Sequence, residues 1–239
     1  MYPYIHIILP SYSVMAFIGA FFSLVFLYLR LGKFQVEFTV FLKLFVLCSI
    51  GGFAGSKLLF ATTQLPWLAK NFSLQNLLLL VPQSGYVFYG GLFGVLFTIF
   101  CFTKKNPTLR KQLFALIAPA IPLFHSFGRV GCLLAGCCYG RVLRIPLVLW
   151  GTVEFQRIPV QIIEASYELL LFLAFLALEK AKPQCDLLKT YLIAYAAFRF
   201  GIEFFRGDEA RGIFFGLSTA QWISIAIITY YVLLEHPQT

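Results

Sequence analysis

Repeated apolar runs, separated by short polar loops, most constrain how this chain can fold. A helix needs about 20 predominantly apolar residues to cross the hydrocarbon core of a membrane. Only 12% of the residues are charged, against roughly 25% in soluble domains. We therefore predict an all-α integral membrane protein, a polytopic bundle of about seven transmembrane helices in a single domain, residues 1–239. The expected spans begin near residues 12, 40, 86, 112, 160, 187 and 214.

The segments between the spans have their own signals. Residues 64–82 mix apolar and polar side chains, and we predict an interfacial or re-entrant loop there. Residues 141–158 are more polar and rich in β-branched residues, which indicates a small excursion outside the membrane. Pro119 and Pro122 should break or kink the fourth span. The N-terminus has no basic region, so it does not resemble a cleaved signal peptide.

Lysine and arginine predict the orientation. Loops after spans one, three and five are rich in lysine, and the positive-inside rule makes them cytoplasmic, with the N-terminus outside and the C-terminus inside. The other side carries mainly arginine, which suits bidentate contact with phosphate. The net charge of +9 therefore fits topology and anionic lipid headgroups, and we expect no nucleic-acid partner.

The segment Phe127–Arg141 contains four glycines, three cysteines and two arginines. Arginine in an apolar span is costly and usually marks function, so a lipid phosphate is the first expected partner. Arg199 and Glu203 are four residues apart in span six and should share a helix face. They could bind phosphate or neutralise each other. Arg206, again on that face, could guide phosphate or reach the interface as a snorkelling side chain.

With these motifs the chain resembles the bacterial prolipoprotein diacylglyceryl transferase family. The resemblance follows the family's motif order over most of the chain. The matching segments are Tyr12, Gly51–Gly55, Phe88–Gly94, Gly128–Gly131, Gly136–Gly140, Arg157–Gln161 with Glu164, Phe198–Arg206 and Leu217–Gln221.

The resemblance implies transfer of the diacylglyceryl group of phosphatidylglycerol to the cysteine thiol of a lipoprotein precursor with a lipobox, releasing glycerol phosphate. It implies a bacterial cytoplasmic membrane and no cofactor, and we assign no metal site. The expected catalytic residues are Arg129, Arg199, Tyr89 and His125. The expected substrate-binding residues are Tyr12, Gly90, Gly91, Gly128, Gly131, Gly140, Arg157, Gln161, Glu164, Glu203 and Arg206.

The sequence departs from the family pattern at the site itself. Tyr89 stands where the family usually has histidine, and Cys132, Ala135 and Cys137 replace asparagines and a glutamate. A catalytically altered member, which binds anionic phospholipid or serves another acceptor, is therefore the alternative. Tyr89 suits hydrogen-bond donation better than proton abstraction, because its ordinary pKa is about 10.

Two groups of residues keep several interpretations. His125 could act as the general base or be structural. Glu164 could also be a base, although we favour a buried ion pair with Arg157 or Arg129. For Cys132, Cys137 and Cys138 we favour apolar packing. The alternatives are a disulfide from Cys132 to Cys137 or Cys138, a transient covalent link to lipid, and a soft metal site with His125.

Overall fold

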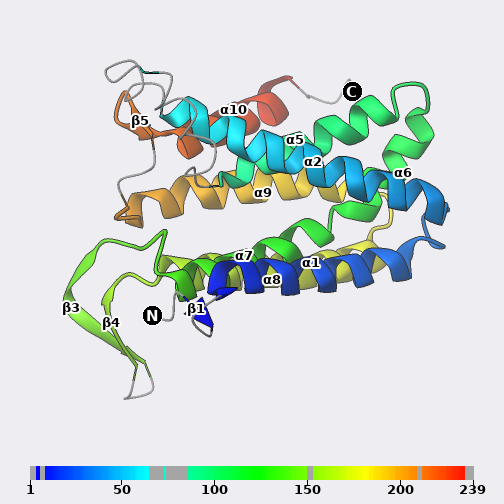
Figure 1. The fold of residues 1–239 in the computed structure, drawn as a ribbon. Coiled ribbons are helices and arrows are strands. Elements are labelled where there is room, and N and C mark those ends of the chain that lie inside the picture. Colours follow the sequence, from blue (N-terminus) through cyan, green and yellow to red (C-terminus); the bar gives the residue numbers. More distant parts are fainter. Residues whose placement is uncertain are drawn as a thin grey trace. The chain divides into compact units, whose positions relative to one another are not determined.

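The structure is a computed structural model that describes residues 4–5, 9–64, 73, 86–149, 153–208 and 212–234. It is mostly helical (Figure 1). The helices are α1 (Ser11–Arg30), α2 (Phe38–Thr63), α5 (Phe88–Phe102), α6 (Pro107–Ile117), α7 (Ala120–Ala135), α8 (Val160–Ala181), α9 (Leu187–Ile202) and α10 (Thr219–Thr229). A 3-10 turn, Glu203–Phe205, extends α9, and a π-helical turn, Tyr230–Leu234, extends α10.

The helices agree with the expected spans, except that the fourth begins earlier and the seventh begins at Thr219 rather than near Phe214, because residues 213–218 form a short strand pair. With α6 and α7 taken as one interrupted helix, Pro107–Ala135, the described residues form seven helical segments, as predicted. Four of them, α1, α2, α6–α7 and α8, are long and apolar enough to cross a membrane. The predicted loop at residues 64–82 lies almost wholly outside the described residues.

The fourth segment differs from the prediction at its start. The helix begins at Pro107 rather than near Gln112, because Asn106 caps it: the Leu109 N–H donates to Asn106 Oδ1 at 3.0 Å. Proline is well suited to a first helical position, where its missing N–H has no helical partner. The expected break falls at Ala118 and Pro119, between α6 and α7.

Three short antiparallel strand pairs accompany the helices. They are β1 (Tyr4–Ile5) with β2 (Leu9–Pro10), β3 (Val142–Leu149) with β4 (Val153–Arg157), and β5 (Ile213–Phe214) with β6 (Leu217–Ser218). The β3–β4 hairpin forms most of the excursion predicted at 141–158, and its position outside the membrane stays a prediction. Its register shifts between Val142 and Leu147, where Pro146 cannot donate to the ladder.

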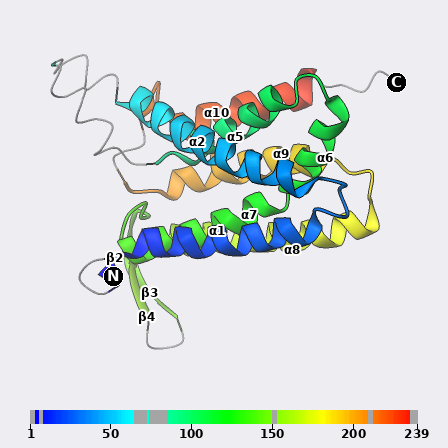
Figure 2. The same ribbon diagram turned by 45° about the vertical axis from the view of Figure 1, so that its right-hand side comes forward.

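The chain divides into two compact units. Unit 1 comprises Met1–Arg30, Phe114–Ala210 and Ser224–Thr239, and unit 2 comprises Leu31–Leu113 and Arg211–Ile223. In unit 1, α1, α7 and α8 run side by side in both ribbon views (Figures 1 and 2). In unit 2, α2 packs along α5 (Figure 2).

Unit 1 buries charge and exposes large apolar side chains. Phe17 and Leu29 on α1 are each 74% exposed, whereas Glu164 and Glu168 on α8 are 1% and 0% exposed. Such broad apolar exposure is unusual for a soluble monomer, and buried ionisable groups typically face the interior of a membrane bundle. The distribution is that of a helical bundle surrounded by lipid.

Glycines form the α2–α5 contact in unit 2. A Cβ atom added at Gly55 would collide with the carbonyl oxygen of Gly90, and one at Gly90 would collide with that of Gly55. Small residues allow helix backbones to approach this closely in membranes. The Gly51–Gly55 segment therefore forms the packing face of α2 against α5.

Candidate active site

Two side-chain contacts, which we call rungs, join α7 to α8 in unit 1: an ion pair between Arg129 and Glu164 and a hydrogen bond between His125 and Glu168. His125 and Arg129 are four residues apart on α7, and Glu164 and Glu168 are four apart on α8, so each pair shares a helix face. His125 Nδ1 lies 3.0 Å from Glu168 Oε1, and Arg129 Nε lies 3.2 Å from Glu164 Oε2. The expected ion pair between Glu164 and Arg129 is confirmed.

Helix α9 adds a second arginine to the same carboxylate. Arg199 Nη1 donates to Glu164 Oε1, and Arg199 Nη2 lies 2.8 Å from Glu203 Oε2. The predicted shared face of Arg199 and Glu203 is therefore confirmed. We call His125, Arg129, Glu164, Glu168, Arg199 and Glu203 the buried ion cluster; each is at most 7% exposed. Glu164 links three helices because it contacts both arginines.

The two arginines of the buried ion cluster differ in which of their guanidinium nitrogens contact a carboxylate. Arg199 directs both terminal nitrogens at carboxylates. Arg129 meets Glu164 through Nε, and among the described contacts its Nη1 reaches only Cys132 Sγ, at 4.0 Å. Arg129 is therefore the member of the cluster whose guanidinium fork is best placed to accept an anion.

Arg206 does not share the helical face of Arg199, and that prediction is wrong. The α-helix ends at Ile202, and after the 3-10 turn Arg206 has extended backbone angles, φ −75° and ψ 144°. Its guanidinium binds Asp208 through two hydrogen bonds of 2.8 and 2.5 Å. The side chain is 6% exposed, so in this structure it is not a snorkelling arginine.

The chain after α7 is held between the start of α8 and the end of α9. Arg141 N–H donates to the Phe205 carbonyl at 2.9 Å, and Ile158 N–H donates to the Arg141 carbonyl at 3.0 Å. A Cβ atom at Gly140 would lie 2.8 Å from Ile158 Cβ. Gly140 therefore has a packing reason to be glycine, and its contact with substrate stays a prediction.

Arg157 also contacts the chain segment that follows α7. It donates to the Gly140 carbonyl at 3.3 Å, and its guanidinium lies 4.5 Å from the centre of the Tyr139 ring. It is exposed, and among the described residues it makes no ion pair with Glu164, which was one of the two partners expected for that carboxylate.

A tight turn at the end of α7 gathers three cysteines. Gly136 is left-handed, with φ 74°, and its N–H donates to the Leu133 carbonyl, while the Cys137 N–H donates to the Cys132 carbonyl at 3.1 Å. This pair of bonds is a Schellman motif. Gln161 Nε2 donates to the Cys137 carbonyl at 2.8 Å, which ties the turn to α8.

The thiols of this turn are free. All six cysteines, each among the described residues, are free thiols, so the disulfide considered between Cys132 and Cys137 or Cys138 is not formed. Hydrogen bonds from the Cys132 and Cys137 thiols lower the pKa of the Cys138 thiol well below its ordinary value. The apolar-packing interpretation of the three cysteines stays a prediction.

The remaining residues predicted in unit 1 lie along α1 and α7. A Cβ atom at Gly131 would lie 3.2 Å from both Met15 Cβ and Tyr12 Cδ2, so Gly131 lets α1 approach α7 next to Tyr12. A Cβ atom at Gly128 would meet no atom within 4 Å in the described part of the chain. Packing against α1 therefore explains why residue 131 is a glycine, whereas the described contacts do not explain the glycine at residue 128.

The other predicted residues belong to unit 2. Tyr89 is 2% exposed, and its ring stacks on Phe93 with the centroids 5.9 Å apart. Gly90 makes the close approach to Gly55. A Cβ atom at Gly91 would be in ordinary contact with the Gly52 carbonyl oxygen, at 3.5 Å.

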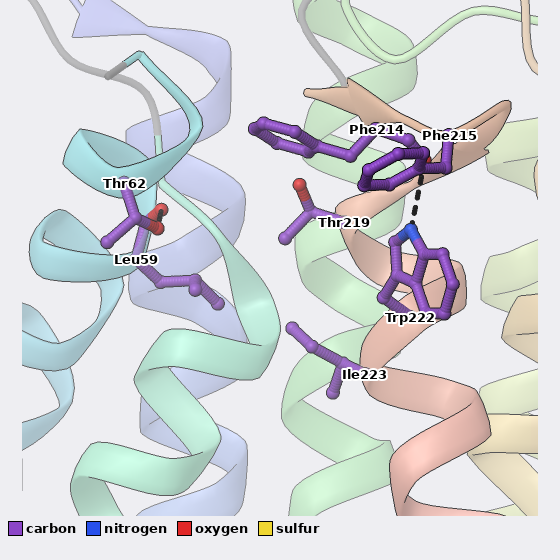
Figure 3. Close-up of a pocket in the computed structure, with 7 residues that line it drawn as sticks. All are labelled: Leu59, Thr62, Phe214, Phe215, Thr219, Trp222 and Ile223. Atoms are coloured by element: carbon purple, nitrogen blue, oxygen red, sulfur yellow. Dashed lines mark hydrogen bonds between the residues drawn. The ribbon is translucent and has the colours of Figure 1, made fainter. Parts of the chain in front are cut away.

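Unit 2 also contains an apolar cavity of about 490 Å³. Its lining residues are Leu59, Thr62, Phe214, Phe215, Thr219, Trp222 and Ile223 (Figure 3). Trp222 Nε1 donates to the Phe214 carbonyl at 3.0 Å along one wall of the cavity (Figure 3). None of the residues predicted for catalysis or substrate binding lines the cavity.

Sequence reasoning missed two acidic partners. Glu168 orients His125, and Asp208 binds Arg206. The signal for Glu168 was present, because two carboxylates four residues apart in an apolar span are rare and should face a partner helix. Asp208 gave no comparable signal, since it follows the end of a helix.

The fold and the buried ion cluster define a multi-pass helical membrane protein with arginines and carboxylates at one internal site. A sequence model of the family described as prolipoprotein diacylglyceryl transferase matches residues 4–235. The chain belongs to this family.

Named relatives support the assignment. A phosphatidylglycerol–prolipoprotein diacylglyceryl transferase of Clostridium tetani is 33% identical over 188 residues, which cover 75% of this chain and 73% of the relative. A second such transferase, from Clostridium perfringens, is 33% identical over 196 residues, covering 79% and 75%. One from Idiomarina loihiensis is 30% identical over 162 residues, covering 64% and 60%. The similarity to the family expected from the motifs is therefore confirmed.

Proposed function

We propose that this protein transfers the diacylglyceryl group of phosphatidylglycerol to the thiol of a lipobox cysteine in a lipoprotein precursor, releasing glycerol phosphate. The observation that carries the proposal is Arg129, a buried arginine whose Nε lies 3.2 Å from Glu164 Oε2 and whose Nη1 reaches, among the described contacts, only Cys132 Sγ at 4.0 Å. The names of the relatives give the same two substrates. We treat residues 1–239 as one transferase-like domain without a nucleic-acid partner.

Arg129 would bind the phosphate of the lipid headgroup and stabilise the charge that develops as glycerol phosphate leaves. Donors fixed in place before the reaction cost no reorganisation when the charge appears. Arg199 is held between Glu164 and Glu203, so we assign it to positioning this carboxylate and, through it, Arg129. Tyr12 and Gly128 lie on the same part of unit 1 and would line the headgroup.

Activation of the acceptor thiol is the second chemical requirement, because the thiolate is the nucleophile. His125, with Glu168 orienting its Nδ1, has the arrangement of a general base with a supporting carboxylate. It is only 5% exposed, however, and its burial favours a structural role in the α7–α8 rung. Tyr89 is assigned as a hydrogen-bond donor to a phosphate or ester oxygen.

We place the protein in the bacterial cytoplasmic membrane with its N-terminus outside. The lysine-rich loops support this orientation. Within unit 1, Tyr12 at the start of α1 lies beside Gly131 near the end of α7, and Arg30 at the other end of α1 binds Glu179 near the end of α8. In this orientation the arginines of the predicted site occupy the outer half of the bundle.

A transfer assay with purified protein tests the proposal. The protein in detergent is mixed with phosphatidylglycerol and a lipobox peptide, and released glycerol phosphate is measured. We expect release that requires the peptide cysteine and disappears when serine replaces it. Arg129→Ala should abolish release, and Arg129→Lys should release little, because a point charge cannot replace a bidentate fork.

Arg30→Ala is the matched control, since Arg30 also forms a two-bond pair with a glutamate, 2.9 and 2.6 Å, in a half-buried position at the far end of α1. It should retain transfer. Normal release by the Arg129→Ala variant would remove Arg129 from the site. Phosphatidylglycerol that binds without any release in the wild type would favour the alternative, an altered member that binds anionic lipid or serves another acceptor.

A further inference from the structure

Three thiols meet at the end of α7 in an arrangement that the transfer reaction does not itself require. The Sγ atoms of Cys132, Cys137 and Cys138 all lie within 4.8 Å of one another. Cys132 is buried, Cys138 is half-buried and Cys137 is exposed. The cluster is therefore closed on the protein side and open on the other.

The backbone builds this arrangement before any ligand arrives. The Schellman bond from the Cys137 N–H to the Cys132 carbonyl, 3.1 Å, brings the first two residues together. Cys138 has φ 56°, a left-handed conformation that is unfavourable for a residue with a Cβ atom and persists only where the surroundings enforce it. Gln161 and the Gly207 N–H, which donates to the Tyr139 carbonyl at 2.9 Å, hold the turn on either side.

The sulfur spacing suits a soft metal ion. A Zn²⁺–thiolate bond is about 2.3 Å long, so three thiolates around a tetrahedral ion are about 3.8 Å apart. Thiolates select soft ions such as Zn²⁺, Cd²⁺ and Cu⁺ over Mg²⁺ or Ca²⁺. Arg129 Nη1 lies 4.0 Å from Cys132 Sγ, so a positive charge stands beside the three sulfurs.

We propose that Cys132, Cys137 and Cys138 form a three-thiolate site for a soft metal ion of the Zn²⁺ class, with its fourth coordination position open on the side of Cys137. Three protein ligands with one open position are the arrangement of catalytic rather than structural zinc sites. His125 is not a member of the group, because the described ligand atoms that lie within 4.8 Å of one another are the three sulfurs.

The three thiols lie beside the arginine assigned to the lipid phosphate, since Arg129 Nη1 is 4.0 Å from Cys132 Sγ, and this part of the inference rests on the proposed function. The acceptor cysteine binds the ion as a thiolate, and its proton passes to water. The sulfur then forms a bond to the glyceryl carbon of the lipid while the bond from that carbon to the phosphate oxygen breaks. The electron pair leaves on glycerol phosphate, and the neutral thioether dissociates from the ion. A metal-bound thiol is deprotonated without a general base, so the buried His125 is not needed for this step.

Metal binding is tested first, without reference to transfer. Full-length protein in detergent, kept reduced and stripped with a chelator, is titrated with Cd²⁺ and Zn²⁺, and cadmium–thiolate absorption and bound metal are measured. We expect one ion for each chain. Cys137→Ser and Cys138→Ser should weaken binding by more than about tenfold, since even outer-sphere partners contribute on that scale. Cys185→Ser, which removes a half-buried thiol elsewhere in unit 1, should bind normally.

Cys137 is the decisive position because its exposed side chain can change without loss of folding. Equal metal binding by Cys137→Ser and the wild type would overturn the site. A protein that takes up no ion while reduced would also overturn it, as would a stable disulfide among the three cysteines in protein prepared with reductant.

Binding of the acceptor thiol at the open position is tested by two other measurements, a cobalt spectrum and the dependence of transfer on metal. With Co²⁺ as the bound ion, a lipobox peptide should change the cobalt–thiolate spectrum, whereas the serine peptide should not. Chelation should reduce transfer by about tenfold or more, with recovery on addition of Zn²⁺ and with phosphatidylglycerol binding unchanged. An unchanged cobalt spectrum, or equal transfer without metal, would overturn thiol activation. Metal binding and a peptide-dependent spectrum without transfer under any condition would instead contradict the proposed function and leave the metal site standing.

Discussion

Glu164→Gln should destabilise the protein more than any other substitution of similar size in the buried ion cluster. Glu164 is 1% exposed and contacts both Arg129 and Arg199. Glutamine keeps the shape of the side chain and removes its charge. Arg199 would keep Glu203 at 2.8 Å, so most of the loss falls on Arg129.

The magnitude follows from that contact. Two unit charges 3.2 Å apart attract by roughly 5 kcal/mol at an effective dielectric constant of about 20. Removing one partner of a buried pair costs about 3–5 kcal/mol, because the other charge stays buried and uncompensated. For a chain of this length, that loss corresponds to a fall in melting temperature of about 10 °C.

The free energy of unfolding can be measured in mixed micelles titrated with a denaturing detergent. The matched control is Glu179→Gln, which removes the partner of Arg30 in a pair that is 12% exposed on each side and is therefore better hydrated. It should lose less than Glu164→Gln. The double variant Glu164→Gln, Arg129→Gln should lose about 1–3 kcal/mol less than the sum of the single variants. A loss below about 1 kcal/mol for Glu164→Gln, or strict additivity, would refute the assignment of this carboxylate as the link between helices.

Two further predictions use other parts of the molecule. Gly90→Ala should destabilise unit 2 by about 1–3 kcal/mol, because the added Cβ meets the Gly55 carbonyl oxygen and lies 2.7 Å from Leu59 Cβ. Gly91→Ala should be tolerated, because its added Cβ lies 3.5 Å from the Gly52 carbonyl oxygen. Equal stability of the two variants would contradict this helix contact. A reporter that is active only outside the cytoplasm should work when fused to the N-terminus and fail at the C-terminus, and the reverse result would invert the proposed orientation.

Much of the fold could be predicted because hydrophobic length is a local property. Each expected span corresponds to a helical segment, and the break at Pro119 follows from the missing proline N–H. The early start at Pro107 was missed because the span rule counts apolar residues and not caps. Asn106 followed by proline is a helix-start signal, but it stands in a segment whose polar residues indicated a loop.

The site was harder to predict, because sequence treats its arginines as equivalent. Arg129, Arg199 and Arg206 each stand in a family motif, and each could bind phosphate on charge alone. The contacts separate them: Glu164 and Glu203 occupy the two ends of the Arg199 fork, and Asp208 occupies Arg206. The Glu203 and Asp208 contacts are local, whereas the contacts of Glu164 with Arg129 and Arg199 depend on helix packing between segments 35 residues apart, and no local pattern encodes them. The spacing of His125 to Arg129 and of Glu164 to Glu168 did contain part of the answer. Two i, i+4 pairs of opposite ionisable types on neighbouring antiparallel helices are satisfied together when the helices face each other. That requirement leaves Arg129 held through one nitrogen, with its remaining donors toward the cysteine turn. Cys132 and Cys137, which replace polar residues of the family pattern, therefore belong to the thiol cluster next to the arginine of the buried ion cluster best able to accept a ligand.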